Sequence, residues 1–157
     1  MGKKIDFKEI SLHDTPNESS GFLLWHISTA WRSSIELRLK SIGLTHPQFV
    51  ILATLGWLTR KGDKVAQILI SKMSGLDPTT VSQIIRGLEQ KGFLTREKSS
   101  DGRAKNPMLT HKGSEILKKA LPAVETKDAE FFRSLTVEEK ECMMGIFQKL
   151  IHKPADF

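Results

Sequence analysis

The feature that most constrains the fold is the stretch at residues 77–92, DPTTVSQIIRGLEQKG, which is marked at both ends as a short helix. Asp77 is a good N-cap, Pro78 suits the first helical position because its missing N–H costs nothing there, and Gly92 is a plausible stop. Helical periodicity separates an apolar face from a polar, hydrogen-bonding face, a division typical of a helix that reads DNA. The apolar face holds Val81, Ile84, Ile85 and Leu88; the polar face holds Thr79, Gln83, Arg86 and Gln90, with Thr80 and Ser82 at its flanks.

The segment just before this helix predicts a second helix packed across it. Residues 64–73 carry apolar side chains at helical spacing, and Ser74, Gly75 and Leu76 form a short turn. A helix, a short glycine-containing turn and a second helix make a helix-turn-helix, whose second helix enters the DNA major groove, about 12 Å wide. An ordinary helical hairpin would show the same pattern, so this segment alone leaves both interpretations open.

A β-hairpin is predicted after the reading helix. Residues 93–97 and 108–110 have strand character and flank the polar tip KSSDGRAKN. A helix-turn-helix followed by a hairpin is a winged helix. Pro107 lacks a backbone donor, so the pairing of the return strand is expected to be short or irregular.

The tip of the hairpin supplies cationic side chains for DNA. Lys98, Arg103 and Lys105 lie on a glycine-containing turn, from which a cation would reach the narrow minor groove beside the reading helix. Asp101 lies two residues before Arg103. Its carboxylate would repel a phosphate, but it would hold the guanidinium in one orientation.

Amphipathic helices are predicted on the N-terminal side of this central segment. Residues 1–20 form a loosely ordered arm that ends in a cap at Ser19 or Ser20. The helix at 21–41 has more apolar surface than one neighbour covers, which suggests either a partner subunit or a wide core contact within the same chain. The next helix opens at Thr45 and is apolar nearly all round, so it belongs in the middle of the domain.

The C-terminal third is also helical. A helix that starts near Lys112 runs past Pro122, which is expected to kink or break it. Thr136 and Glu139 then form a capping box for a last helix whose apolar stripe includes Cys142, an expected buried and inert thiol. Two terminal amphipathic helices suit a two-fold dimer, with recognition helices about 34 Å apart.

The positive charge is concentrated in the central segment. The 157-residue chain has a net charge of +6, and residues 60–112 hold eleven Lys and Arg against five Asp and Glu. The whole excess therefore lies in this segment, as a phosphate-binding surface requires.

Several other classes are excluded or disfavoured. One cysteine cannot form an internal disulfide or a multi-cysteine metal site, which suits a reducing cytoplasm. The longest apolar run, residues 49–58, is about half of a ~20-residue membrane span. We find no catalytic set of residues, no phosphate loop and no cofactor motif, so no enzyme activity and no cofactor are expected. His111 and Glu115 are only two candidate zinc ligands, so no metal site is assigned.

The order of the elements and several short strings resemble the MarR family of bacterial transcriptional regulators. The likeness covers residues 22–150, and the combination of D-x-R with L-T-x-x-G is its most specific part. The matching strings are GLT at 43–45 with QF at 48–49, LEQKGFLTR at 88–96, DGR at 101–103 and LTHKG at 109–113.

The resemblance implies a mainly α-helical fold with a small β-hairpin wing, flanked by N- and C-terminal dimerisation helices. It implies a homodimeric regulator, expected to be a repressor, that binds a pseudo-palindromic operator in double-stranded DNA. The implied domain is 1–157, with the arm at 1–20, mainly dimerisation helices at 21–59 and 113–157, and a winged helix-turn-helix lobe at 60–112. The implied DNA contacts are Thr79, Thr80, Ser82, Gln83, Arg86, Arg103 and Lys105, with Asp101 orienting the wing.

Many members of this family bind small aromatic or phenolic effectors. Trp25, His26, Trp31, Arg32 and Phe49 would offer aromatic walls and a cation, but such a stripe is more often core, and no effector site is assigned. Two alternatives stay open. One is a winged-helix protein-interaction module that does not bind DNA, and the other is a redox- or metal-responsive member of the same family.

Overall fold

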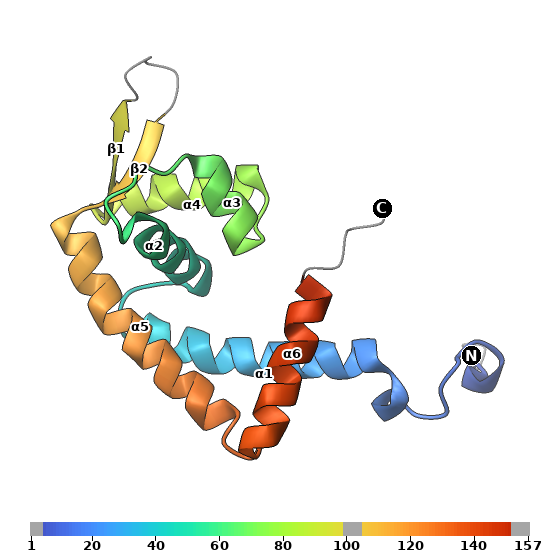
Figure 1. Ribbon diagram of the computed structural model, residues 1–157. Helices are drawn as coiled ribbons and strands as arrows, with labels where there is room; N and C mark the ends of the chain where they lie inside the picture. Colours follow the sequence, from blue (N-terminus) through green and yellow to red (C-terminus); the bar gives the residue numbers. More distant parts are fainter. Residues whose placement is uncertain (1–4, 99–104, 152–157) are drawn as a thin grey trace.

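The computed structural model describes residues 5–98 and 105–151, which form a mainly helical chain with one β-hairpin. A lobe built from α2, α3, α4 and the hairpin lies at one end of the molecule, and α5 leads from this lobe to α1 and α6 (Figure 1). The elements are the 3-10 helices η1 (Phe7–Glu9) and η2 (Pro16–Glu18), helices α1 (Ser20–Lys40), α2 (His46–Thr59), α3 (Gln67–Ser74) and α4 (Pro78–Gln90), strands β1 (Leu94–Lys98) and β2 (Lys105–Leu109), and helices α5 (His111–Phe131) and α6 (Val137–Ile151). This architecture confirms the predicted fold class.

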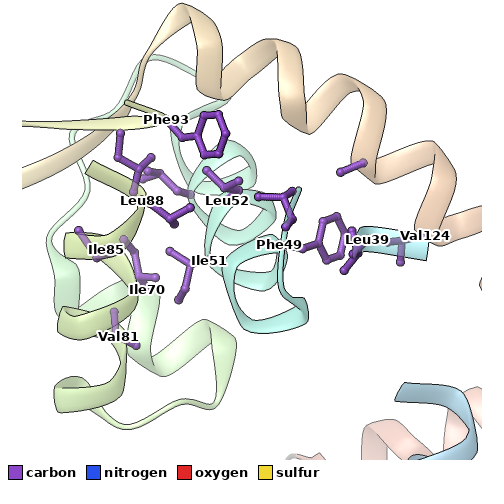
Figure 2. Close-up of a cluster of buried hydrophobic side chains, with 14 of the residues drawn as sticks. Leu39, Phe49, Ile51, Leu52, Ile70, Val81, Ile85, Leu88, Phe93 and Val124 are labelled. Atoms are coloured by element: carbon purple, nitrogen blue, oxygen red, sulfur yellow. The ribbon is translucent and has the colours of Figure 1, made fainter. Parts of the chain in front are cut away.

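Helix α2 is the centre of the core, as its nearly all-round apolar sequence predicts. Figure 2 shows Phe49 beside Leu39 of α1 and Val124 of α5, whereas Ile51 lies toward α3 and α4. All of these side chains are buried. One helix therefore connects the lobe that carries α4 to α1 and α5.

Polar caps set the starts of most helices. Ser19, Thr45, Asp77, Thr110 and Thr136 each accept a hydrogen bond from a backbone N–H in the first turn of the following helix. The caps at residues 19, 77 and 136 are those predicted from the sequence. The arm before α1 contains two short 3-10 helices, and its described side chains are exposed apart from the half-buried Ser11 and Ser19.

Helix α3 is shorter than predicted. It begins at Gln67 rather than near residue 64, and its N-cap residue Ala66 has no side-chain hydrogen bond. Val65 is buried although it precedes the helix. Its position continues the apolar spacing of α3 beyond the helix itself, which explains why the sequence pattern overestimated the length.

Pro122 does not break the helix, because α5 is continuous through this residue. Pro122 is exposed, so the hydrogen bond that its ring removes is lost on the solvent side of the helix. Ala120, Ala123 and Val124 are buried on the opposite side. Buried residues before and after Pro122 in the sequence therefore maintain the helix.

The expected irregular pairing of the wing is also wrong. Strands β1 and β2 pair without a bulge from Leu94 opposite Leu109 to Lys98 opposite Lys105. The N–H of Thr110 donates to the carbonyl of Phe93, so residues at alternate positions from Phe93 form the hydrogen-bonded pairs. Pro107 lies opposite Arg96, in a pair that exchanges no hydrogen bonds. Its missing donor costs nothing there, and its ring is buried.

Cys142 is exposed, which corrects the expectation of a buried thiol. The apolar stripe of α6 packs only sparsely on the rest of its own chain, and Ile146, Leu150 and Ile151 are exposed with it. On α1, Leu24, Trp25 and Ile27 are likewise exposed. The amphipathic patterns were identified correctly, but one chain alone does not cover them.

Candidate DNA-binding surface

Helix α4 separates its two kinds of side chain as the sequence predicts. Val81, Ile85 and Leu88 are 0% exposed, whereas Ile84 is half-buried. The side chains of Thr79, Gln83 and Arg86 are exposed on the other side, with no hydrogen bond or ion pair to the described part of the chain. Their polar groups are therefore available to a ligand. Gln90 is also exposed but belongs to the last turn.

Thr80 has a structural role at the start of α4. Its N–H donates to Asp77 Oδ1 at 2.9 Å, and its hydroxyl donates to Asp77 Oδ2 at 2.5 Å. These hydrogen bonds, led by the one from the hydroxyl, lower the pKa of Asp77. The hydroxyl proton of Thr80 is thus already in use, although its oxygen still has acceptor capacity. Ser82 is half-buried at the other flank.

The predicted wing contacts are only partly described. Asp101 and Arg103 lie outside the described residues, as does most of the predicted tip. Lys105 begins β2, opposite Lys98 at the end of β1. The hairpin follows α4 after a turn at Gly92, whose φ of 73° favours glycine.

An ion pair between Glu89 and Arg96 joins the reading helix to the wing and was missed by sequence reasoning. Arg96 Nε lies 2.9 Å from Glu89 Oε2, and the two side chains are 19% and 28% exposed. The Nε atom is buried and its N–H is not aligned for a hydrogen bond, so the attraction is mainly that of opposite charges. The two residues are seven positions apart across a turn, a spacing for which no helical rule predicts a contact.

A second linkage joins the end of α4 to the corner between α1 and α2. Lys91 Nζ donates to the carbonyl of Gly43 at 3.1 Å and to Gln48 Oε1 at 2.9 Å. Lys112 Nζ donates to the carbonyl of Lys91 at 2.9 Å and lies 5.1 Å from the centre of the Phe93 ring. These lysines therefore join helices rather than standing free on the basic surface.

The start of α5 is fitted against the turn after α4. The hydroxyl of Thr110 donates to the carbonyl of Gly92 at 2.7 Å and accepts the N–H of Gly113 at 3.0 Å. A Cβ on Gly113 would lie 1.9 Å from the carbonyl oxygen of Phe93. The L-T-x-x-G string thus has a physical basis, because the threonine ties the wing to α5 and the glycine permits close contact.

The aromatic residues considered for an effector do not gather in one pocket. Trp31 Nε1 donates to Asp128 Oδ1 at 2.7 Å, and its ring meets the His46 ring edge-on with 5.1 Å between the centres. This contact joins α1, α2 and α5. Burial first, and then the nearby Arg32 cation, lower the pKa of His46. Trp25, His26 and Arg32 are exposed, whereas Phe49 is in the core.

Hollows on the described surface include two that lie between helices. The first has a volume of about 570 Å³ and lies between α1, the end of α5 and α6, with Leu24, Ile27 and Phe147 among its apolar walls. The second, of about 870 Å³, lies between α2, α3, β2 and α5 and is called here the α2–α5 cleft. Its lining includes Trp57 and Leu121.

The described residues contain no group of three or more His, Cys, Asp and Glu side chains that could hold a metal ion. Glu115 pairs instead with Lys118 at 2.7 Å, and this hydrogen bond is the main cause of its lowered pKa. Within the same described ranges, no helix has both the length and the apolar character needed to cross a bilayer.

Comparisons with known proteins agree with this geometry. Residues 40–130 match the model of the ArnR1-like winged-helix domain. The uncharacterised HTH-type transcriptional regulator YdcH of Bacillus subtilis (strain 168) is 34% identical over 139 residues, which is 88% of this chain and 94% of YdcH.

Solved structures of regulators share the fold. A MarR-family transcriptional regulator from Rhodococcus sp. RHA1 superposes with a TM-score of 0.79 at 18% identity, over 90% of this chain and 99% of that chain. CouR from Rhodococcus jostii RHA1, bound to p-coumaroyl-CoA, superposes with a TM-score of 0.78 at 19% identity, over 90% of this chain and 98% of CouR. MepR from S. aureus, in complex with DNA, superposes with a TM-score of 0.76 at 23% identity, over 87% of this chain and 97% of MepR. The chain therefore belongs to the ArnR1-like winged-helix family and is a transcriptional regulator with the fold of the MarR-family proteins.

Proposed function

We propose that this regulator binds a pseudo-palindromic operator in double-stranded DNA as a homodimer and acts as a repressor. The observation that carries the proposal is the division of α4, whose apolar face is buried in the lobe while Thr79, Gln83 and Arg86 stand free on the outside. A helix held in this way presents hydrogen-bonding side chains to base edges without losing its packing.

The side chains of α4 and the wing divide the contacts between the two grooves. Arg86 is suited to the O6 and N7 atoms of guanine and Gln83 to the N6 and N7 atoms of adenine. Thr79 and Ser82 have shorter side chains that supply hydroxyl contacts to DNA. The hydroxyl of Thr80 donates to Asp77, so it can only accept a hydrogen bond from DNA or serve the helix cap. In the minor groove we place Arg103, oriented by Asp101, with Lys105 beside it.

The homodimer is supported by the uncovered apolar surface outside the lobe. Apolar residues of α1 and α6 line the hollow of about 570 Å³ together with the end of α5. A two-fold contact here would bury them and set two α4 helices about one DNA turn apart, ~34 Å. In this proposal residues 60–112 form the winged helix-turn-helix, and residues 21–59 with 113–157 mainly form the dimer, with α2 packed between the two parts.

A small aromatic or phenolic effector is proposed to release the DNA. CouR, which shares the fold, was solved with p-coumaroyl-CoA, and MepR was solved with DNA. An effector that binds more tightly when the two lobes are spaced differently from the operator-bound state would lower DNA affinity. The loss equals the difference between the effector's binding free energies for the two spacings. Screening aromatic acids for release of operator DNA identifies it.

The experiment that tests DNA binding combines selection and salt titration. Operators are selected from a random duplex pool, and affinity is measured across a range of salt concentrations. We expect a steep fall in affinity as salt rises, because phosphate neutralisation releases counterions. At least four of the eleven cations in residues 60–112 have partners in their own chain, namely Arg60, Lys91, Arg96 and Lys112, so the slope should be smaller than the charge count suggests.

Arg86→Ala is the matched variant and Gln90→Ala its control, because both side chains are exposed on the polar face of α4 but Gln90 belongs to the last turn, away from the N-terminal turns that are proposed to dock. Arg86→Ala should cost about 1–3 kcal/mol and relax specificity at one position of each half-site. Gln90→Ala should leave affinity nearly unchanged. Affinity that does not depend on salt for any duplex would refute DNA binding and favour a protein-interaction role.

A further inference from the structure

Glu89 is the one acidic residue of α4, which runs from Pro78 to Gln90. At about 100° per residue its side chain leaves the helix about 60° from that of Arg86, at the border between the buried face and the polar face. A carboxylate at this border lowers DNA affinity, because the phosphates that line the major groove repel it. The cap residue Asp77 differs, since N–H groups of the first turn compensate its charge. Glu89 therefore needs a cation of its own.

The wing supplies this cation. Arg96 Nε lies 2.9 Å from Glu89 Oε2, and the two side chains are 19% and 28% exposed. Arg96 follows Leu94 by two residues on β1, so both side chains lie on the same face of the strand, and Leu94 is buried. The arginine is therefore directed toward the lobe, where salt screens the pair less than it would screen an exposed pair. Glu89 is neutralised without using a cation of the polar face.

Arg86 is a second cation within reach of Glu89. It lies three residues earlier on the same helix, where side chains are neighbours, and it is exposed without a partner in the described part of the chain. Helix α5 contains a pair with the same order and spacing, Lys127 with Glu130. On α4 the carboxylate of Glu89 is instead held by Arg96, and the guanidinium of Arg86 stays available.

We infer that Arg96 is a positioning residue for DNA recognition: by holding Glu89, it neutralises the one carboxylate of α4 and keeps Arg86 available for a base. The inference rests on the proposed function, in which α4 enters the major groove. Because the effect of Arg96 on DNA affinity passes through Glu89, removing Glu89 should cancel the need for Arg96. This dependence separates Arg96 from an arginine that contacts phosphate or that only anchors the wing.

Three variants of the full-length chain test this dependence: Arg96→Met, Glu89→Gln and the two combined. Affinity for the selected operator is measured by fluorescence anisotropy at one low salt concentration, and circular dichroism checks that each variant is folded. Arg96→Met should weaken binding about three- to tenfold, because Glu89 then pairs with Arg86 and repels nearby phosphates. The combined variant should recover to within about twofold of the parent chain, because an amide does not compete for Arg86.

Two further measurements separate the contributions. Glu89→Gln alone should bind at least as tightly as the parent chain, because it loses a negative charge near the phosphates. In an Arg86→Ala background, Arg96→Met should cost less affinity than in the parent background, since one of its two effects is already gone.

The outcomes that contradict the inference differ from failure of the proposed function. A combined variant as weak as Arg96→Met overturns the inference, because the pair would then act only by anchoring the wing. A folded Arg96→Met variant that binds like the parent chain, or that loses equal affinity in the Arg86→Ala background, also overturns it. Where Arg96→Met does not fold, a folded Glu89→Gln variant that binds more weakly than the parent chain overturns it. A parent chain that binds no duplex overturns the proposed function itself.

Discussion

Replacing Gly113 by alanine should be among the most destabilising small changes in this chain. The new Cβ would lie 1.9 Å from the carbonyl oxygen and 2.9 Å from the carbonyl carbon of Phe93. Carbon and oxygen atoms in contact are normally about 3.3 Å apart, so α5 and the turn have to separate by more than about 1 Å. Backbone atoms block the new methyl group, and no rotamer change relieves the clash.

The separation breaks the contacts that Thr110 makes at the same place. Its N–H donates to the carbonyl of Phe93 at 3.1 Å, and its hydroxyl donates to the carbonyl of Gly92 at 2.7 Å. Losing these hydrogen bonds and overpacking the contact should together lower the free energy of unfolding by about 3–5 kcal/mol. The wing would also shift relative to α4, so DNA affinity should fall even where the protein stays folded.

Gly87→Ala is the matched control, since Gly87 is also helical but its Cβ would lie 3.9 Å from the nearest atom outside its own helix, Gln48 Nε2. Alanine there should raise the free energy of unfolding by about 0.5–1 kcal/mol. Both variants are compared by urea unfolding followed by circular dichroism, at one protein concentration because dimerisation contributes to stability. A Gly113→Ala variant within about 1 kcal/mol of the parent would refute the close-contact reasoning.

Three further predictions concern the linkages and the wing. Glu89→Gln leaves the buried Nε of Arg96 without its carboxylate, and urea unfolding should show a loss of about 1–3 kcal/mol; an unchanged midpoint would mean that the ion pair contributes nothing. The lowered pKa of His46 means that the unfolded chain binds this proton more readily than the folded chain, so stability should be full above about pH 6.5 and decline as the pH falls toward the lowered pKa. His46→Gln should flatten that decline in unfolding curves between pH 7 and 5, whereas an identical slope would assign it to other groups. Arg103→Ala should weaken binding by about 1–3 kcal/mol, most at operators with A·T-rich flanks, and an equal loss on all flanks in gel-shift titrations would argue against a minor-groove contact.

Local patterns predicted the fold well where they had one physical cause. The cap at Asp77 and the apolar stripe of α4 each follow from short-range rules, and both are present. Pro107 and Pro122 were misjudged because the cost of a missing N–H depends on the direction in which it points. That direction follows from strand pairing and from solvent exposure, neither of which the sequence alone displays.

The candidate site was predictable only in part for a related reason. Periodicity identifies which side chains share a face, so the exposure of Thr79, Gln83 and Arg86 on α4 was predicted. It does not identify contacts between elements, so the pair Glu89 and Arg96 was missed. The burial of Cys142 was misjudged because an apolar stripe indicates that a helix face needs a cover, but not which chain supplies it.

The hydrogen bonds of Lys91 have a mechanical consequence. One ammonium group holds the carbonyl of Gly43 and the amide of Gln48, which fastens the end of α4 to the corner between α1 and α2. Tilting α4 inside its lobe would break these bonds, whereas a movement of the lobe that carries Gly43 with it leaves them intact. Helix α4 therefore moves together with the corner between α1 and α2. A signal that changes the DNA affinity without breaking these bonds has to reorient the whole lobe rather than α4 alone.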